Sequence, residues 1–463
     1  MSKSSFAAIV PAAGLGTRMK SSIPKFLHPL CGRSMITHIV LSLEHVVDEI
    51  VVVVGNGGEQ VEREIETTCA PFLERITFVE QRELLGSGHA TKMGMTGLTI
   101  DAHNIIVVLG DMPLLTSEVL TEMCNSFLAC EADVLVSTAI LDNPHGYGRI
   151  VRDENKIVKA IVEEKDCDDA QRAITECNMY PFVFTRSFLE IALDKLDTNN
   201  SQGEQYLTDV VEIARDSSKA VTSYTYHDPK IAQGANDRAQ MSELEFIMRD
   251  TINTDHMKNG VTMTDPANTY VDAGVTLEAD VILLPGTILQ GTTSVAKGSV
   301  VGPNTRIVDS IIGRDCTIES STVKGSTIED DVTVGPYASL RPGTILRKGA
   351  HVGTFVETKK SDIGAGSKVP HLSYIGDATV GENTNLGGGT ITANYDGATK
   401  HPTVIGNNVS TGVHTVLVAP VSVGDESYTG AGAVVTKDVP AGSLAKGVPA
   451  TIDEDWIPPK DRP

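Results

Sequence analysis

The stretch "VTLEADVILLPGTILQGTTSVAKGSVVGPNTRIV", residues 275–308, places an aliphatic side chain at every sixth position. The recurring residues are Leu277, Leu283, Leu289, Val295, Val301 and Ile307. A fixed short period is typical of a solenoid, in which each repeat packs against its neighbours. Six residues per face and three faces per turn predict a parallel β-helix, with one aliphatic side chain per face filling its narrow interior.

The same period resumes after short slips and continues through most of the C-terminal half. Its further members are Ile328, Val334, Leu340, Leu346, Val352, Ile363, Val369, Ile375, Ile405, Leu417, Val423 and Val435. A β-sandwich is the alternative, but sandwich strands alternate in polarity and repeat about every 8–12 residues. The repeat breaks at "LGGGTITANYDGATKHPTV" (386–404). We expect this segment to project as a loop, and such loops on a rigid scaffold often carry function.

The N-terminal half alternates apolar strands with helical patterns. The strand candidates are "FAAIV" (6–10), "EIVVVVG" (49–55), "ITFVEQ" (76–81), "NIIVVLGD" (104–111) and "DVLVSTAIL" (133–141). Continuous apolar strands separated by helices predict a parallel sheet covered on both faces. Ligands of such sheets bind beyond the carboxyl ends of the strands. The stretch 227–262, with "MSELEFIMRDTI", predicts a helix that joins the two halves.

Composition excludes several classes of protein. The chain has 463 residues, which predicts two or three domains, and its formal net charge of −22 argues against non-specific binding to nucleic acid or anionic membranes. The seven cysteines show no C-x-x-C spacing, so we expect neither a disulfide framework nor a zinc site. We expect the protein to work in a reducing cytoplasm. We find neither a signal-peptide core nor an apolar stretch of about 20 residues that would span a bilayer.

A glycine-rich loop, "PAAGLGTRMKSSIPKFLHPLCG" (11–32), follows the first strand. It matches neither G-x-x-x-x-G-K-[ST] nor G-x-G-x-x-G. Gly14 and Gly16 allow backbone N–H groups to face phosphate oxygens. Arg18 can bind two phosphate oxygens at once, and Lys25 adds a point charge. The loop therefore predicts a phosphate site, and Asp111, which ends a nearby strand, is of the type that Mg²⁺ prefers alongside phosphate oxygens.

The order of the motifs resembles, over nearly the whole chain, the bacterial family of bifunctional N-acetylglucosamine-1-phosphate uridyltransferases and glucosamine-1-phosphate acetyltransferases. The first half contributes "AAGLGTRMKSSIPKFLHPLCG", "QRELLGSGHA", "LGDMPLL", "HGYGRIV", "IVEEKD", "CNMYPFVF", "QGEQYLTD" and "GANDR". The second contributes "LRPG", "HVGTFVETKKS", "HLSYIGDATVGENTNLGGGTITANYDG" and "TGAGAVVTKDVPAG". The resemblance implies an α/β Rossmann-like nucleotidyltransferase domain at 1–238, a linker helix at 239–260, and a left-handed parallel β-helix of hexapeptide repeats with a C-terminal tail at 261–463.

The resemblance also implies two steps of UDP-N-acetylglucosamine synthesis in the cytoplasm. In the first, the β-helix transfers an acetyl group from acetyl-CoA to glucosamine 1-phosphate. In the second, the N-terminal domain uses Mg²⁺ to transfer a uridylyl group from UTP to N-acetylglucosamine 1-phosphate and releases pyrophosphate. It further implies a homotrimer with the acetyl sites at the junctions of three β-helices.

For the uridylyl site, the resemblance assigns Arg18 and Lys25 as catalytic cations and Asp111 and Asn236 as metal ligands. The implied UDP-sugar contacts are Pro11, Ala12, Ala13, Gly14, Lys25, Gln81, Gly86, Ser87, Leu109, Gly110, Asp111, Gly148, Glu163, Asn178 and Asn236. Gln81 suits uracil, because a side-chain amide can satisfy the imide edge of the base. Pro11 departs from the Leu that relatives often have.

For the acetyl site, the resemblance assigns His371 as the general base. A histidine pKa near 6.5 suits the removal of a proton from an amine at neutral pH. The implied sugar-phosphate contacts are Arg341, Lys359, Tyr374, Asn385 and Lys400, and the implied acetyl-CoA contacts are Gly388, Asn394, Tyr395, Val413, Ala431 and Lys446. Departures gather at the coenzyme end. Val413 replaces a frequent Ser, Gly388 replaces a frequent Ala, and Lys446 and Gly447 lie near a position that is often Arg.

Three alternatives remain at this point. The first is a monofunctional sugar-1-phosphate nucleotidyltransferase with a structural β-helix, against which the intact His371, Asn394 and Tyr395 argue. The second is a non-catalytic regulatory subunit, which would be expected to have lost Arg18, Lys25 or Asp111. The third is activation of another sugar with another nucleotide, which only the resemblance disfavours.

Overall fold

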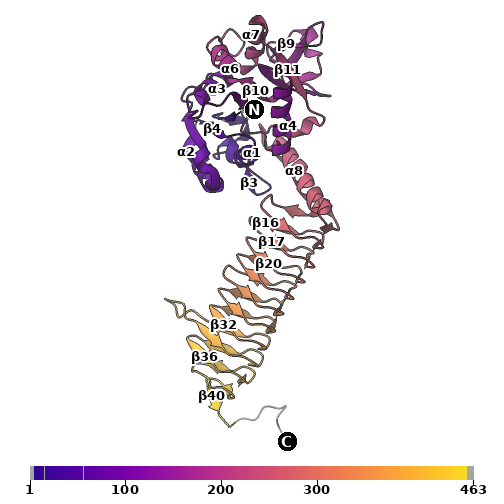
Figure 1. Ribbon diagram of the computed structural model, residues 1–463. Coiled ribbons are helices and arrows are strands. Elements are labelled where there is room, and N and C mark those ends of the chain that lie inside the picture. The colour runs from indigo at the N-terminus through magenta and orange to yellow at the C-terminus, as the bar shows by residue number, and fades with distance from the viewer. Residues whose placement is uncertain (1–4, 15, 56, 456–463) are drawn as a thin grey trace. The chain divides into compact units, whose positions relative to one another are not determined.

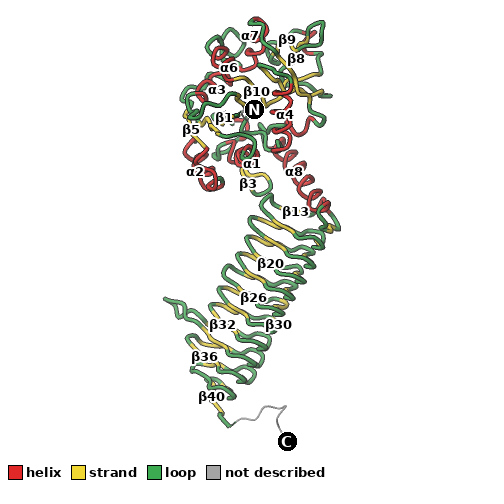
Figure 2. The backbone as a smooth tube through the Cα atoms, viewed as in Figure 1, coloured by secondary structure: helices red, strands yellow, loops and turns green. Residues whose placement is uncertain are grey.

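The structure is a computed structural model that describes residues 5–14, 16–55 and 57–455 (Figures 1 and 2). It divides into two compact units, Met1–Met248 and Arg249–Pro463. The boundary falls inside helix α8 (Arg238–Lys258), which is shorter than the 227–262 stretch from which a helix was predicted.

The first unit contains a mixed sheet with the strand order β11-β7-β10-β6-β1-β4-β5. Its strands are β1 (Phe6–Ala12), β4 (Glu49–Val54), β5 (Ile76–Glu80), β6 (Asn104–Val107), β7 (Val134–Ile140), β10 (Glu176–Thr185) and β11 (Val221–Thr225). A hairpin of β8 (Arg149–Arg152) and β9 (Val158–Val162) extends from β10. The prediction of a purely parallel sheet is wrong, because β10 pairs antiparallel with both β6 and β7.

Helices cover both faces of this sheet, as predicted (Figure 1). One face carries α1 (Met35–Leu43), α2 (Gly58–Thr68) and α4 (Ser117–Ala129); the other carries α3 (Ser87–Met95), α6 (Arg186–Leu193) and α7 (Val210–Asp216). The short α5 (Asp169–Arg172) follows the β8–β9 hairpin. Two hydrophobic cores result because side chains alternate along a strand. In β1, Val10 packs into the first core and Ile9 into the second.

The second unit is a column of short parallel strands in three sheets, which we call its first, second and third faces (Figure 2). The first face contains β12 (Thr262–Met263), β15 (Ile282–Leu283), β18 (Val300–Val301), β21 (Thr317–Ile318), β24 (Thr333–Val334), β27 (His351–Thr354) and β30 (Lys368–His371). The second contains β13 (Tyr270–Val271), β16 (Ile288–Gln290), β19 (Arg306–Val308), β22 (Thr322–Lys324), β25 (Ser339–Leu340), β28 (Glu357–Lys359), β31 (Tyr374–Gly376), β33 (Ile391–Ala393), β35 (Val416–Val418) and β38 (Val434–Val435). The third contains β14 (Thr276–Leu277), β17 (Ser294–Val295), β20 (Ile311–Ile312), β23 (Thr327–Ile328), β26 (Ile345–Leu346), β29 (Asp362–Ile363), β32 (Ala378–Val380), β34 (Thr403–Ile405) and β36 (Val421–Val423). A small sheet of β37 (Tyr428–Thr429), β39 (Leu444–Gly447) and β40 (Ala450–Asp453) follows.

The six-residue period fills the interior of this left-handed parallel β-helix. Leu283 pairs with Val301 in the next coil, and Leu289 pairs with Ile307 in the same way. The predicted aliphatic residues are buried in one continuous core, except Leu277, which is partly buried. The predicted break is smaller than expected, because β33 lies inside the 386–404 stretch and remains part of the second face.

We predict that Leu346→Ala lowers the free energy of unfolding of the β-helix by about 2–5 kcal/mol, because Leu346 is fully buried and truncation leaves a cavity. Urea denaturation followed by circular dichroism measures the change. Val404→Ala is the matched control, since Val404 is 46% exposed on the same face and its truncation is expected to cost less than about 0.5 kcal/mol. Equal losses in the two variants would contradict the interior role of the period.

Candidate active sites

The glycine loop after β1 folds back over Lys25. Gly16 has φ of +58°, and a Cβ built on it would lie 2.6 Å from the Cβ of Lys25. A side chain at this position is therefore excluded by both conformation and space. The turn Thr17–Met19 can then pass close to Lys25, which begins the next turn, Lys25–Leu27.

Four polar side chains from distant parts of the sequence meet beside this loop. The Lys25 ammonium forms an ion pair with the Asp111 carboxylate, and its Nζ donates to Asn236 Oδ1 at 2.8 Å. Arg18 Nη2 donates to the same Asn236 oxygen at 2.9 Å. Lys25 and Asp111 are nearly buried, with side-chain exposures of 10% and 13%. The structure thus brings the two predicted catalytic cations, Arg18 and Lys25, into one polar cluster with the two predicted metal ligands, Asp111 and Asn236.

A cavity of about 430 Å³ opens onto these four residues. The other predicted residues that line it are Pro11, Ala13, Gly14, Gln81, Gly86, Ser87 and Leu109. Ala12 and Gly110 do not line it; Ala12 is buried in the sheet, and Gly110 N donates to Pro11 O at 3.1 Å behind the wall. Glu204 lines the cavity and was missed, although it lies within the quoted motif "QGEQYLTD".

The wall that carries Gln81 is braced by backbone contacts. Gln81 Nε2 lies 2.9 Å from His89 Nδ1 and 3.4 Å from Gly86 O, so the amide is held in place. Gly88 N donates to Gln205 O at 2.8 Å, and Gln205 N donates to Leu85 O at 2.7 Å. The segment after β5 and the segment around Gln205 therefore form one braced edge of the cavity.

Three of the predicted UDP-sugar contacts form a second group: Gly148 just before β8, Glu163 just after β9, and Asn178 in β10. Asn178 N donates to Gly148 O at 2.7 Å, and Glu163 Oε1 accepts from Thr208 Oγ1 at 3.0 Å. A Cβ on Gly148 would lie 3.5 Å from both Asn178 Cβ and Glu163 Oε2, so the three residues are neighbours. Burial raises the pKa of Glu163. They do not line the 430 Å³ cavity, and Asn178 Oδ1 is buried with no hydrogen-bond partner among the described residues.

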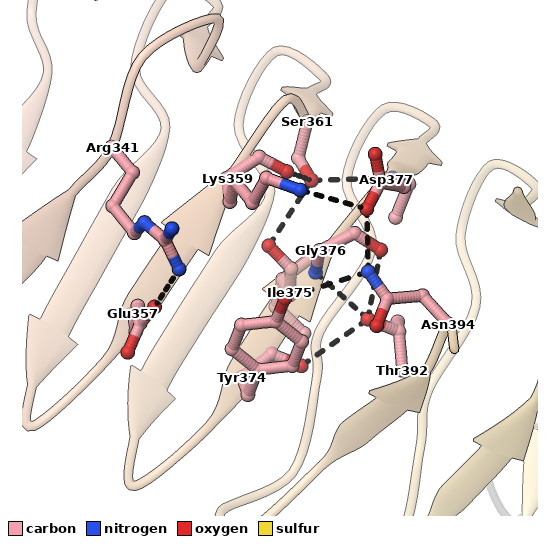
Figure 3. A network of polar contacts seen from close by, with 11 residues as sticks. Arg341, Glu357, Lys359, Ser361, Tyr374, Ile375, Gly376, Asp377, Thr392 and Asn394 are labelled. Carbon is pink, nitrogen blue, oxygen red and sulfur yellow. Dashed lines mark hydrogen bonds and ion pairs between the residues drawn. The ribbon is translucent and has the colours of Figure 1, made fainter. Parts of the chain in front are cut away.

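In the β-helix, predicted sugar-phosphate residues gather on the second face (Figure 3). Lys359 ends β28, Tyr374 begins β31, and Arg341 follows β25. Arg341 Nη1 donates to Glu357 Oε1 at 2.9 Å. Arg341, Lys359 and Tyr374 therefore lie on or directly after three consecutive strands of one sheet, β25, β28 and β31.

The projecting segment after β33 holds two more predicted residues against each other. Tyr395 pairs with Lys400 as an antiparallel bridge, and Tyr395 is 58% exposed. The hairpin tip is closed by His401 Nε2, which lies 2.7 Å from Asp396 Oδ2. Lys359 lies close enough to Lys400 to lower its pKa, because two ammonium groups repel each other. The hairpin thus brings Lys400 to the Lys359 side of the site.

His371 lies where two faces of the β-helix meet. It ends β30 on the first face, and Tyr374 begins β31 on the second, so the two flank one corner of a coil. The His371 side chain is exposed. Asn385 pairs with Lys368 and therefore extends the first face by one coil.

Three of the predicted coenzyme residues, Gly388, Val413 and Ala431, lie at the same corner in the coils that follow. His414 N donates to Gly388 O, and Gly432 N donates to Val413 O, both at 2.8 Å. Val413 is 53% exposed, Ala431 is exposed, and Lys446 Nζ lies 3.5 Å from Asp453 Oδ2. A Cβ on Gly388 would lie 3.4 Å from His371 Cβ, so this departure leaves the base slightly more room.

Among the described residues, no helix is long and apolar enough to cross a membrane.

Comparisons with known proteins agree with the fold predicted for each half of the chain. Residues 8–210 match the family model of the MobA-like NTP transferase domain, and residues 402–437 match the hexapeptide repeat of succinyl-transferase. The bifunctional protein GlmU of Heliobacterium modesticaldum is 46% identical over 95% of this chain and 94% of its own length. That of Streptomyces coelicolor is 46% identical over 97% of this chain and 94% of its own. A solved structure of UDP-glucose pyrophosphorylase complexed with UDP-glucose matches 55% of this chain and 99% of its own length, at 19% identity and with a TM-score of 0.43.

The fold and the two sites define a bifunctional transferase, with a nucleotidyltransferase domain followed by a hexapeptide β-helix. The identities above show that the chain belongs to the GlmU family. The predicted class is thereby confirmed: it is an enzyme with an N-terminal uridyltransferase and a C-terminal hexapeptide acetyltransferase.

We predict that Gly86→Ala lowers kcat/KM for uridylyl transfer by roughly 10-fold or more. Gly86 has φ of +106°, and a Cβ would lie 2.6 Å from Gln205 O, so the braced edge must shift. Steady-state assays with UTP measure the effect. Gly203→Ala is the control, because Gly203 also has positive φ (+67°) but has nothing within 4 Å of its Cβ. Equal effects of the two variants would show that backbone conformation, and not the contact with Gln205, matters.

Proposed function

We propose that the chain makes UDP-N-acetylglucosamine in two steps. The β-helix acetylates glucosamine 1-phosphate with acetyl-CoA, and the N-terminal domain then joins the product to UTP and releases pyrophosphate. The catalytic parts would be 1–238 and 261–463, linked by 239–260, in a cytoplasmic enzyme. The observation that carries the first activity is the contact of Arg18, Lys25, Asp111 and Asn236 at one cavity.

The first site suits the union of two anions. A sugar phosphate can attack the α-phosphate of UTP only if the repulsion between them is overcome by positioning and positive charge. Lys25 and Arg18 supply that charge on the lining of the cavity, and Gln81, which is held by His89, offers an amide to the uracil.

Mg²⁺ fits the donor set of this site. Asp111 provides a carboxylate and Asn236 an amide oxygen on the same cavity, and Mg²⁺ commonly takes one or two such ligands together with phosphate oxygens. The part of the chain that the structure describes contains no cluster of three or more His, Cys, Asp and Glu side chains that could hold a metal. Bound there, the ion would neutralise phosphate charge.

The second site suits acyl transfer to an amine. Arg341, Lys359 and Lys400 would hold the phosphate of glucosamine 1-phosphate, and His371 at the adjacent corner would accept the proton from its amine. The free amine then attacks the thioester carbonyl of acetyl-CoA, and coenzyme A leaves as the thiol. Gly388, Val413 and Ala431 lie at the same corner in successive coils, and we expect acetyl-CoA to bind along them.

An exposed apolar ridge beside His371 supports the proposed homotrimer. Tyr337, Phe355 and Leu372 occupy the same corner of successive coils and are 62%, 59% and 61% exposed. The rings of Tyr337 and Phe355 stack, with centroids 5.6 Å apart. All three have positive φ, which costs free energy for such side chains. If identical subunits pack against one another through this ridge, the three side chains become buried and a neighbouring chain lies against the acetyl site.

We predict that Asp111→Asn and His371→Ala separate the two activities. Asp111→Asn removes charge from the metal ligands and should lower the uridylyl-transfer rate by on the order of 10² to 10⁴, leaving acetyl transfer within about twofold. His371→Ala should lower acetyl transfer at pH 7 by roughly 10² to 10⁴ and leave uridylyl transfer within about twofold. Pyrophosphate release measures one activity and release of the coenzyme A thiol the other.

Each variant is thus the control for the other. Raising the pH should partly restore acetyl transfer by His371→Ala, because more of the amine is then unprotonated. A wild-type chain that releases no thiol with glucosamine 1-phosphate would favour the nucleotidyltransferase with a structural β-helix. Loss of both activities in either variant would indicate misfolding and remove the support for that residue.

We predict that Phe355→Asp dissociates the trimer, because it places a carboxylate in the centre of the apolar ridge. Light scattering at micromolar concentration should give a trimer mass for the wild type and a monomer mass for the variant. Acetyl transfer should fall with the trimer, and uridylyl transfer should persist. A monomeric wild type with full acetyl transfer would overturn the proposed assembly.

A further inference from the structure

Asp377 lies at the centre of the polar network on the second face of the β-helix, although the sequence reasoning did not single it out (Figure 3). It follows β31 at a coil corner, with φ of 51°. Its backbone N–H donates to Lys359 O at 2.9 Å, and its carbonyl oxygen accepts from Thr403 N at 3.1 Å. Neighbouring coils therefore fix the backbone of Asp377, and its side chain has a defined direction.

One oxygen of the Asp377 carboxylate contacts two of the residues assigned to substrates. Asn394 Nδ2 donates to Asp377 Oδ2 at 2.5 Å, and Lys359 Nζ lies 3.4 Å from the same atom. The side chains of Lys359 and Asp377 are 11% and 19% exposed, and Asn394 is buried. In this shielded position, hydrogen bonds to a carboxylate are stronger than neutral ones.

The carboxylate decides which way the Asn394 amide faces. A carboxylate only accepts hydrogen bonds, so the NH₂ group of Asn394 must point to it. The same Nδ2 also lies 3.4 Å from Tyr374 OH, which occupies its other hydrogen. The Asn394 Oδ1 atom is thereby left to accept from an N–H group of the bound molecules, either the amine of the sugar or an amide of the coenzyme arm.

The carboxylate also balances the positive charge of the phosphate site. Lys359 and Lys360 both act on Lys400, and Asp377 is a carboxylate that acts on both Lys359 and Lys400; Tyr374 is a further titratable group beside Lys359. Asp377 acts to raise the pKa of Lys400, against the lowering by the two lysines. The nearby Glu357 is engaged by Arg341 at 2.9 Å.

We propose that Asp377 is a positioning residue for acetyl transfer, which holds the Lys359 ammonium for the sugar phosphate and turns the Asn394 carbonyl oxygen toward a substrate N–H. This inference rests on the acetyltransferase function proposed above. Asp377 touches no reacting atom itself, so its removal should weaken binding and alignment without abolishing the chemistry.

The test compares Asp377→Asn, Asp377→Glu and a matched control in the full-length chain. Asp377→Asn keeps the size and removes the charge, and kcat/KM for acetyl transfer should fall by roughly 10- to 100-fold. Asp377→Glu restores a carboxylate and should recover part of the loss. The control is Asp331→Asn, because Asp331 is also a corner aspartate with positive φ and lies 3.3 Å from Lys348 Nζ, outside the site.

Two readouts separate positioning from a merely structural role. The KM for glucosamine 1-phosphate should rise in Asp377→Asn, and a parallel rise for acetyl-CoA would assign the N–H partner of Asn394 to the coenzyme instead of the sugar amine. Without the carboxylate, the lysines lose their protons at lower pH. The rise of KM for the sugar phosphate with pH should therefore begin at a lower pH in Asp377→Asn than in the wild type or Asp331→Asn.

Uridylyl transfer by the same molecules is the internal control and should stay within about twofold of the wild type. The proposal is overturned if Asp377→Asn leaves both KM values and the pH profile unchanged, or if Asp331→Asn has the same effects. It is also overturned if Asp377→Asn lowers uridylyl transfer and thermal stability together. A wild-type chain without acetyl transfer would instead overturn the function on which the inference rests.

Discussion

The stacking of aliphatic side chains in the β-helix interior is the constraint on which the second site depends. The strands turn aliphatic residues inward, and parallel pairing places each directly over its counterpart in the next coil, as with Val334 and Val352. Once that column is fixed, every outward residue also has a fixed neighbour one coil away. Glu357 thus lies beside Tyr374 on the second face, and Thr354 beside His371 on the first. A polar site can therefore be built from residues 15 to 20 positions apart without a cleft.

The first site depends on a different constraint, the meeting of strand ends at one edge of a sheet. β1, β4 and β6 run parallel, so the loop after β1 that carries Lys25 and the turn after β6 that carries Asp111 share an edge. Asn236 reaches them from the segment before α8. The antiparallel β10 passes beside β6 and supports the β8–β9 hairpin, which explains why Gly148 and Glu163 form their own group.

Most of the fold could be predicted from the sequence because its two periods are strong. The six-residue aliphatic repeat gave the β-helix, and the continuous apolar strands gave the layered α/β domain. The direction of β10 could not be read, because "CNMYPFVF" is as apolar as a parallel strand and its pairing partners are distant in sequence. The site residues also differ in how far the sequence reveals them. Arg18 and Lys25 stand in a recognisable loop, whereas Asp377 and Glu204 matter through contacts that only the folded chain shows.

The two sites share an electrostatic arrangement that follows from the acidity of the chain. In a protein with a formal net charge of −22, a phosphate site must keep its cations local. Each site does so with a lysine of low exposure paired with a carboxylate: Lys25 with Asp111, and Lys359 with Asp377. An asparagine completes each cluster, Asn236 by accepting from Lys25 and Asn394 by donating to Asp377. The carboxylate holds the ammonium in place and offsets the cost of burying it, since an unpaired buried charge is expensive. A second cation lies in each cluster, since Arg18 donates to Asn236 and Lys400 lies beside Lys359, so two positive charges are available to an anionic substrate at each site.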